Sequence, residues 1–133
     1  MLFRSTAVEI DEFNILQATF MAMKRAVGVL EKMPQYAIID GNQKPKGLPC
    51  ESMTLVKGDA RSYSVAAASI VAKVFRDRLM GDLAKQYPYY GFERNAGYGT
   101  KAHVEGLHKY GIISGIHRKS YRPIQEILSA AAA

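Results

Sequence analysis

The chain has 133 residues, 48% of them hydrophobic, which is enough for one domain with a core and too few for two. A single cysteine, Cys50, excludes a disulfide framework and fits a reducing, cytoplasmic setting, and the lack of an apolar run of about 18 residues argues against a membrane span. The whole net charge of +6 falls after residue 35, an excess that is either a phosphate-binding surface or ordinary solvated surface.

The first predicted element is a helix near the N-terminus. Residues 1–6 contain one arginine and have neither a signal-peptide pattern nor a strand pattern. Asp11 is expected to cap the helix, apolar side chains recur at helical spacing from Ile15 to Leu30, and Pro34 follows its end. The chain therefore starts abruptly, with a helix and no preceding strand.

Two short strands are predicted after this helix. Residues 36–39 form an apolar run without polar alternation, typical of a strand covered on both faces, and residues 40–42 have turn chemistry. Residues 53–56 predict a second strand, which residues 57–59 end. Because two strands make a marginal sheet, the chain is expected either to be a fragment of a wider α/β sheet or to borrow strands from a partner, and we favour the fragment.

The rest of the chain is predicted to be mainly helical. Helices are expected over 64–85, from Thr100 to Tyr110, and after Pro123. Gly111 ends the second of these, and residues 87–99, rich in tyrosine and glycine, are expected to form an ordered loop. The order helix, strand, strand, helix indicates the α/β class.

Asp40 is the first candidate for a chemical role. It stands at the carboxyl end of an apolar strand, the edge where ligands bind in open α/β sheets, and a carboxylate held there needs a cation or hydrogen-bond donors. The alternative is an Asx turn that merely ends the strand. Asp59 follows the second strand and competes for the same role; otherwise it caps the coming helix while Lys57 contacts a phosphate.

Asp77 is the second candidate. It lies four residues after Lys73, which lies four after Ser69, so the three form one polar stripe along the long helix. Alanines on this helix allow it to approach a sheet closely, so that Asp77 can reach the strand ends. The alternative is an exposed ion pair between Lys73 and Asp77, worth roughly a few tenths of a kcal/mol, as on any solvated helix face.

Tyr98 is flanked by glycine on both sides, which lets the backbone approach a neighbour while the ring projects. An aromatic face among basic residues can stack on a sugar or a base, although simple packing is the alternative. The three histidines, His103, His108 and His117, have spacings of five and nine that do not share one helix face, so a zinc site is not expected.

Seven motifs, found in order over residues 9–128, resemble those of bacterial type 2 ribonuclease H (ribonuclease HII). They are Glu9-Ile10-Asp11 with residues 14–19, Ile39-Asp40-Gly41-Asn42, Val56-Lys57-Gly58-Asp59, residues 67–74 with Arg76-Asp77, Tyr90-Gly91-Phe92, Gly97-Tyr98-Gly99-Thr100 with His103, and residues 117–121. One such motif is a weak signal, whereas seven in sequence are specific. The resemblance implies an α/β, ribonuclease H-like fold truncated at the N-terminus. It also implies one partial domain over residues 1–133, in which residues from about 100 onward form a C-terminal helical extension.

The resemblance implies an endonuclease that cleaves the RNA strand of RNA–DNA hybrids and cleaves at ribonucleotides embedded in DNA. Four carboxylates of the family hold Mg²⁺ or Mn²⁺ for two-metal-ion hydrolysis. Two of them belong to an Asp-Glu-Ala-Gly-Arg-Gly motif that is not in this sequence, and Glu9 and Asp11 do not replace them, because they match the start of a later helix. The other two correspond to Asp40 and Asp77.

The resemblance also implies how the substrate is held. Tyr98 corresponds to the tyrosine that packs on the sugar following the ribonucleotide, and Lys57, Lys73, Arg118 and Ser120 are expected to line the substrate path. An intact enzyme of this kind is expected to act as a monomer without a membrane partner. This chain is expected to have little or no activity by itself. The alternatives are a non-catalytic nucleic-acid-binding module and a fragment that does not fold stably alone.

Overall fold

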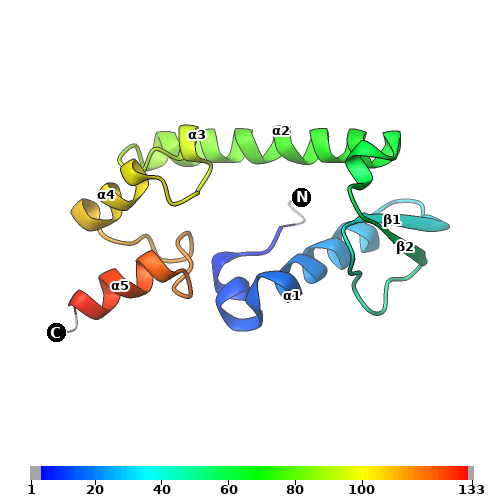
Figure 1. The fold of residues 1–133 in the computed structure, drawn as a ribbon, viewed down its shortest axis with the longest axis horizontal. Coiled ribbons are helices and arrows are strands. Elements are labelled where there is room, and N and C mark those ends of the chain that lie inside the picture. The colour runs from blue at the N-terminus through cyan, green and yellow to red at the C-terminus, as the bar shows by residue number, and fades with distance from the viewer. Residues whose placement is uncertain (1–3, 132–133) are drawn as a thin grey trace. The chain divides into compact units, whose positions relative to one another are not determined.

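The computed structural model of the chain describes residues 4–131, so the expectation for the first residues falls in part on residues 1–3, outside that range. The chain divides into two compact units, Met1–Ile70 and Val71–Ala133 (Figure 1). No helix in the described range combines the length and the apolar character that a membrane span requires.

The first helix, α1 (Ala7–Gly28), begins earlier than expected. Thr6 is its N-cap: the Thr6 side chain accepts a hydrogen bond from the Glu9 backbone N–H, and the Glu9 carboxylate accepts one from the Thr6 backbone N–H. The predicted cap at Asp11 is therefore wrong, because this reciprocal capping box starts the helix one turn before it. A kink follows at Asn14 (φ 68°, ψ 165°), whose side-chain oxygen accepts hydrogen bonds from two following backbone N–H groups and caps the second part of the helix.

The two predicted strands form one parallel sheet. β1 (Tyr36–Asp40) and β2 (Glu51–Leu55) run with Tyr36 opposite Glu51 and Asp40 opposite Leu55, so both strands end at the same edge. The expectation that residues 36–39 are covered on both faces is wrong for the described chain. Ile39 is buried, but Ile38 on the opposite face is 41% exposed, because that face of the two-stranded sheet is not fully covered.

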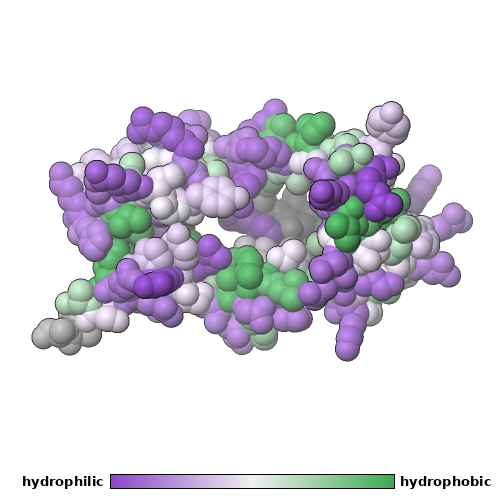
Figure 2. Space-filling view, viewed as in Figure 1, coloured by the Kyte–Doolittle hydropathy of each residue, from purple (hydrophilic) through white to green (hydrophobic). Residues whose placement is uncertain are grey.

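The long helix forms as predicted, to within one residue at each end. A short 3₁₀ turn, η1 (Gly58–Ala60), follows β2, and α2 (Tyr63–Gln86) then begins in the first unit and ends in the second. The first unit has a small core of Ala7, Ala18, Ile39 and Val65. Large apolar side chains remain exposed on α1 and α2, where green patches are visible on the surface (Figure 2).

The second unit packs short helices around the end of α2. Its elements are α3 (Phe92–Asn95), α4 (Lys101–Tyr110) and α5 (Arg122–Ala131). The predicted start and stop of α4 are confirmed: Thr100 caps it through the His103 backbone N–H, and Gly111 follows its end with φ 80°. The predicted loop over 87–99 contains the one-turn helix α3. With four residues, α3 is too short to produce a periodic apolar pattern in the sequence. The core consists of Met80, Tyr90, Phe92, Leu107 and Ile124.

Candidate active site: two carboxylates and a tyrosine loop

Asp40 is held at the carboxyl edge of the parallel sheet. Its Oδ1 accepts a hydrogen bond of 2.8 Å from the backbone N–H of Gly58, in the turn after β2, and the side chain is otherwise exposed. A Cβ on the buried Gly58 would lie 3.2 Å from Val65 Cγ1 and 3.3 Å from Asp40 Oδ1, so glycine allows this close approach. One carboxylate oxygen is thus fixed by the neighbouring strand's turn, which leaves the other available to a ligand.

The rival carboxylate, Asp59, has a local role. Its Oδ1 accepts a hydrogen bond of 2.9 Å from the Ala60 backbone N–H inside η1, so it stabilises this turn and does not cap α2. Lys57, directly before the turn, has a left-handed backbone (φ 54°, ψ 46°) and an exposed side chain. A left-handed lysine costs about 1–2 kcal/mol, and such strain is concentrated at functional sites in proteins.

Asp77 is paired with Lys73 in the described structure. Lys73 Nζ donates to both carboxylate oxygens, at 2.7 and 2.8 Å, and the two side chains are 67% and 51% exposed. The ion pair considered in the sequence is therefore present. Because both groups are so exposed, the pair contributes little stability and a multivalent cation can displace the ammonium group. The pairing is compatible with a metal-binding role.

The segment between α3 and α4 that carries Tyr98 (residues 96–99) is called the tyrosine loop, and buried groups of the second unit hold it in place. The buried Asn95 donates from Nδ2 to the Tyr90 carbonyl at 2.7 Å and accepts from the Gly97 backbone N–H at 2.8 Å. Ala96 (φ 47°) and Gly97 (φ 80°) both adopt the left-handed region, which turns the chain sharply. The Tyr98 side chain that follows is 71% exposed, as a stacking residue must be.

The remaining two candidates lie in the segment before α5. The Arg118 guanidinium lies 5.4 Å from the centroid of the Tyr121 ring, and Ser120 is exposed. The Tyr121 hydroxyl in turn lies so close to the backbone of Gly99 that a Cβ there would collide with it. Arg118 is therefore connected to the tyrosine loop through an aromatic ring, a contact that no local sequence pattern predicts.

Two of the histidines belong to the core of the second unit. His103 Nδ1 lies 3.0 Å from the Tyr90 carbonyl, and His117 Nδ1 accepts a hydrogen bond of 2.8 Å from the Ile113 backbone N–H. Their rings are 5.4 Å apart. Burial, and secondarily the neighbouring His103, lowers the pKa of His117 to about 4. The His117 imidazole is therefore neutral at neutral pH, and both buried rings pack inside the second unit.

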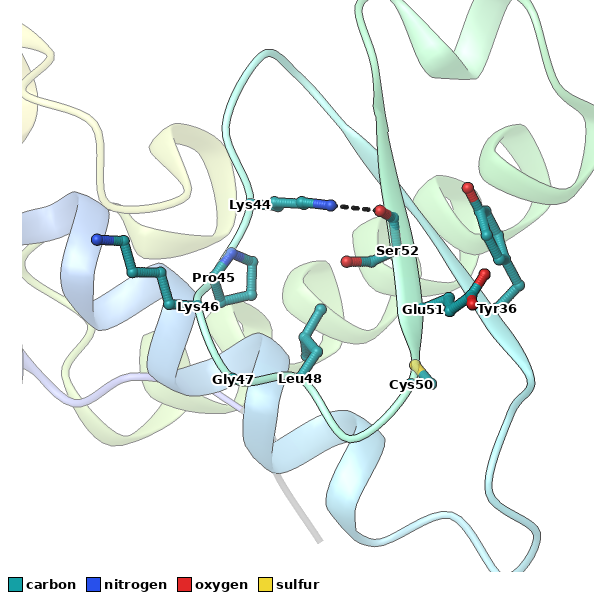
Figure 3. A pocket seen from close by; sticks show the side chains of 9 residues that line it. All are labelled: Tyr36, Lys44, Pro45, Lys46, Gly47, Leu48, Cys50, Glu51 and Ser52. Atoms are coloured by element: carbon teal, nitrogen blue, oxygen red, sulfur yellow. Dashed lines mark hydrogen bonds between the residues drawn. The ribbon is translucent and has the colours of Figure 1, made fainter.

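An open pocket of about 550 Å³ lies at the end of the sheet where the two strands begin, and Figure 3 labels its lining residues. The strand register places Asp40 at the opposite end. The lining of the pocket includes Tyr36 and Glu51, the first residues of the two strands, together with the loop around Lys44 and Lys46. The two lysines are positive, but the pocket receives no candidate carboxylate. It is therefore separate from the edge that carries Asp40.

The donor atoms suit a hard divalent cation. Carboxylate oxygens are the ligands that Mg²⁺ and Mn²⁺ prefer, and Asp40 and Asp77 are both exposed. Between residues 4 and 131, however, no three or more His, Cys, Asp or Glu side chains come together as a complete metal cluster. The described chain thus provides individual carboxylate ligands of the right kind without a full coordination shell.

Comparison with known proteins gives consistent matches. Residues 2–123 match the family model described as Ribonuclease HII. The ribonuclease HII of Endomicrobium trichonymphae is 55% identical over 120 residues, covering 90% of this chain and 57% of that protein. That of Jannaschia sp. (strain CCS1) is 56% identical over 120 residues, covering 90% and 60%. The chain thus spans about three fifths of the length of these curated relatives.

A solved structure is also similar. The crystal structure of the ribonuclease H2 from Pyrococcus horikoshii OT3 matches with a TM-score of 0.75 and 27% identity, and the match covers 94% of this chain and 66% of that one. This likeness confirms the α/β, ribonuclease H-like fold expected from the sequence.

Proposed function

Since the chain belongs to the ribonuclease HII family, we propose that it carries part of the active site of a metal-dependent endonuclease. The enzyme cleaves the RNA strand of RNA–DNA hybrids and cleaves at ribonucleotides embedded in DNA, acting as a single domain and a monomer. One observation carries the proposal: Asp40 is anchored through one oxygen at the carboxyl edge of a parallel sheet, with the rest of its carboxylate exposed.

Asp40 and Asp77 are the metal ligands that this chain contributes. They would hold Mg²⁺ or Mn²⁺, which stabilise the charge that develops on the scissile phosphate. The Gly58 backbone N–H keeps one Asp40 oxygen in place, and Lys73 neutralises Asp77 in the absence of a cation. Both contacts keep the carboxylates oriented, so little reorganisation is needed when a cation binds.

The substrate is held by stacking and by positive charge. The exposed Tyr98 ring packs on the sugar that follows the ribonucleotide, while Lys57, Lys73 and Arg118, with Ser120, contact the backbone. The net charge of +6 supports a phosphate-binding surface, and binding of this kind weakens steeply as salt rises.

Paramagnetic Mn²⁺ tests the metal-binding part of the proposal. Titrating the chain with Mn²⁺ should broaden the backbone NMR signals around Asp40 and Asp77 before any others, because Mn²⁺ relaxes only nearby nuclei. Asp40→Asn should remove the effect at residue 40, whereas Asp82→Asn, an exposed carboxylate at the far end of α2, should leave it unchanged. Broadening spread evenly over all acidic residues would contradict the assignment.

A non-catalytic nucleic-acid-binding module is the second candidate, favoured by the basic charge alone. It requires salt-dependent binding of hybrid that Mn²⁺ does not change. Equal affinity of the chain and its Asp40→Asn variant for hybrid, with and without Mn²⁺, would support this reading over the nuclease.

A further inference from the structure

Arg76, directly before Asp77 in α2, contacts the tyrosine loop twice. Its Nη2 donates a hydrogen bond of 2.7 Å to the Ala96 carbonyl, and its guanidinium carbon lies 5.9 Å from the centroid of the Tyr98 ring. Both contacts lie within the second unit. One side chain thus holds the backbone that precedes Tyr98 and also covers the ring.

The conformation of the loop explains why its carbonyl is available. Ala96 ends α3 in the left-handed region (φ 47°, ψ 32°), which directs its carbonyl away from the hydrogen-bond ladder of that helix. Asn95 and Gly97 secure the base of the loop through the buried Asn95 amide. The strained turn is therefore fixed on one side by Asn95 and on the other by Arg76.

The ring of Tyr98 has two faces, and Arg76 lies over one of them. The side chain is still 71% exposed, so the other face is open to a ligand. A guanidinium over an aromatic face restricts the ring without blocking its far side, and it adds a positive charge where a sugar–phosphate chain would pass. Because Arg76 and Asp77 are adjacent on one helix, the contact also links the ring to the helix that carries the second carboxylate.

We propose that Arg76 is a positioning residue that presets the Tyr98 ring for stacking on the sugar of a ribonucleotide-containing strand. The inference rests on the proposed function and deepens it, since it assigns the orientation of the specificity-determining tyrosine to a second residue. Arg76 acts through Tyr98 and touches no reacting atom.

The first experiment needs no substrate. NMR of the chain with labelled tyrosine rings compares Arg76→Gln, Arg76→Lys and the control Arg78→Gln, a nearby exposed arginine of the same helix. Arg76→Gln should shift the Tyr98 ring signals and make the ring more mobile while the melting temperature stays near that of the parent chain. Arg76→Lys should restore part of the ordering, because a cation over the ring remains. Unchanged Tyr98 signals in Arg76→Gln would overturn the proposal.

The second experiment measures binding to a DNA duplex with one ribonucleotide and to the same duplex without it. Arg76→Gln and Tyr98→Ala should each weaken binding to the ribonucleotide duplex by roughly three- to tenfold, and the double variant no further, since both remove one stacking contact. Arg78→Gln should weaken binding to the two duplexes equally. Additive losses in the double variant would overturn the inference alone and make Arg76 an independent phosphate contact. No binding by the parent chain would instead refute nucleic-acid recognition by this chain, and with it the stacking role.

Discussion

The absence of a side chain at Gly58 positions the candidate metal ligand Asp40. The Gly58 backbone N–H can reach Asp40 because glycine has no Cβ, and a Cβ there would lie too close to Val65 Cγ1 and Asp40 Oδ1. Contacts of 3.2 and 3.3 Å are tighter than ordinary van der Waals distance, so one of the neighbours must move when a methyl group is added.

Gly58→Ala should therefore displace the Asp40 carboxylate. We expect a loss of stability of about 1 kcal/mol from overpacking, and a several-fold weaker Mn²⁺ effect at residue 40. Denaturant unfolding and the Mn²⁺ titration measure the two effects separately. Gly28→Ala, where nothing lies within 4 Å of the new Cβ, is the matched control. Unchanged Mn²⁺ broadening in Gly58→Ala would mean that Asp40 does not depend on this contact.

His117 makes the stability of the second unit depend on pH. Burial lowers its pKa from 6.5 to about 4, so the unfolded chain binds a proton more readily than the fold does. The contribution of neutral His117 to the free energy of unfolding is fully present above pH 6.5. It is lost as the pH falls towards 4, and the loss is up to roughly 3 kcal/mol. Thermal melts of His117→Gln should show a flatter pH dependence over this range, whereas the exposed His108→Gln should retain the slope of the parent chain.

Within the helices, the effect of replacing a glycine by alanine depends on the space around the added Cβ. A Cβ on Gly106, in α4, would lie 2.5 Å from the Tyr89 carbonyl oxygen. Because this oxygen belongs to the backbone, it cannot move away as a flexible side chain could. A Cβ on Gly81, in α2, would meet nothing within 4 Å. Helix propensity favours alanine at both sites by about 1 kcal/mol.

Gly106→Ala and Gly81→Ala should therefore have opposite effects. The first should destabilise the second unit by about 1–3 kcal/mol, because the clash outweighs the propensity gain. The second should stabilise the chain by about 0.5–1 kcal/mol, because only propensity changes. Chemical denaturation of both variants checks the signs, and a stabilising Gly106→Ala would mean that α4 does not pack on residues 89–90 as described.

Short sequence patterns predict where most helices and strands begin and end, but they do not predict what packs against these elements. The cap at Thr100 and the stop at Gly111 were readable because each acts on its own helix end. The start of α1 was misassigned because Asp11 and Thr6 both suit a cap, and the reciprocal bond with Glu9 decides between them. The exposure of Ile38 depends on what covers the sheet, which no pattern within the strand contains.

The candidate site follows the same division. The end of a strand makes Asp40 a candidate and a polar helix stripe makes Asp77 one. These local features leave the alternatives of an Asx turn and an exposed ion pair open, and the family resemblance decides between them. The contact between Arg76 and Ala96 joins residues 20 positions apart, and the approach of Gly58 to Asp40 joins residues 18 apart. Contacts of this range arise from the fold, so sequence spacing could not assign Arg76 a role.

The two units of the whole molecule are unequally packed. The second has a cluster of large buried side chains, including Phe92, Leu107 and Ile124. The first buries mainly small residues and leaves side chains such as Ile15 and Ile38 exposed. Since large buried side chains supply most of the hydrophobic stabilisation, the carboxylate at residue 40 lies in the less stable part of the chain.

Activity of the chain by itself should therefore be very low. The family resemblance implies four metal-binding carboxylates and this sequence matches two, so cations are held by at most half of the expected charge, in a unit with a thin core. A DNA duplex with one ribonucleotide, incubated with the chain and Mn²⁺, should remain uncut, while the ribonuclease HII of Endomicrobium trichonymphae serves as the positive control. Robust cleavage that Asp40→Asn abolishes would contradict this, and would mean that Asp40 and Asp77 suffice with ligands not yet assigned. Cleavage that survives Asp40→Asn would point to a contaminating nuclease and would leave the low activity of the chain as the consistent result.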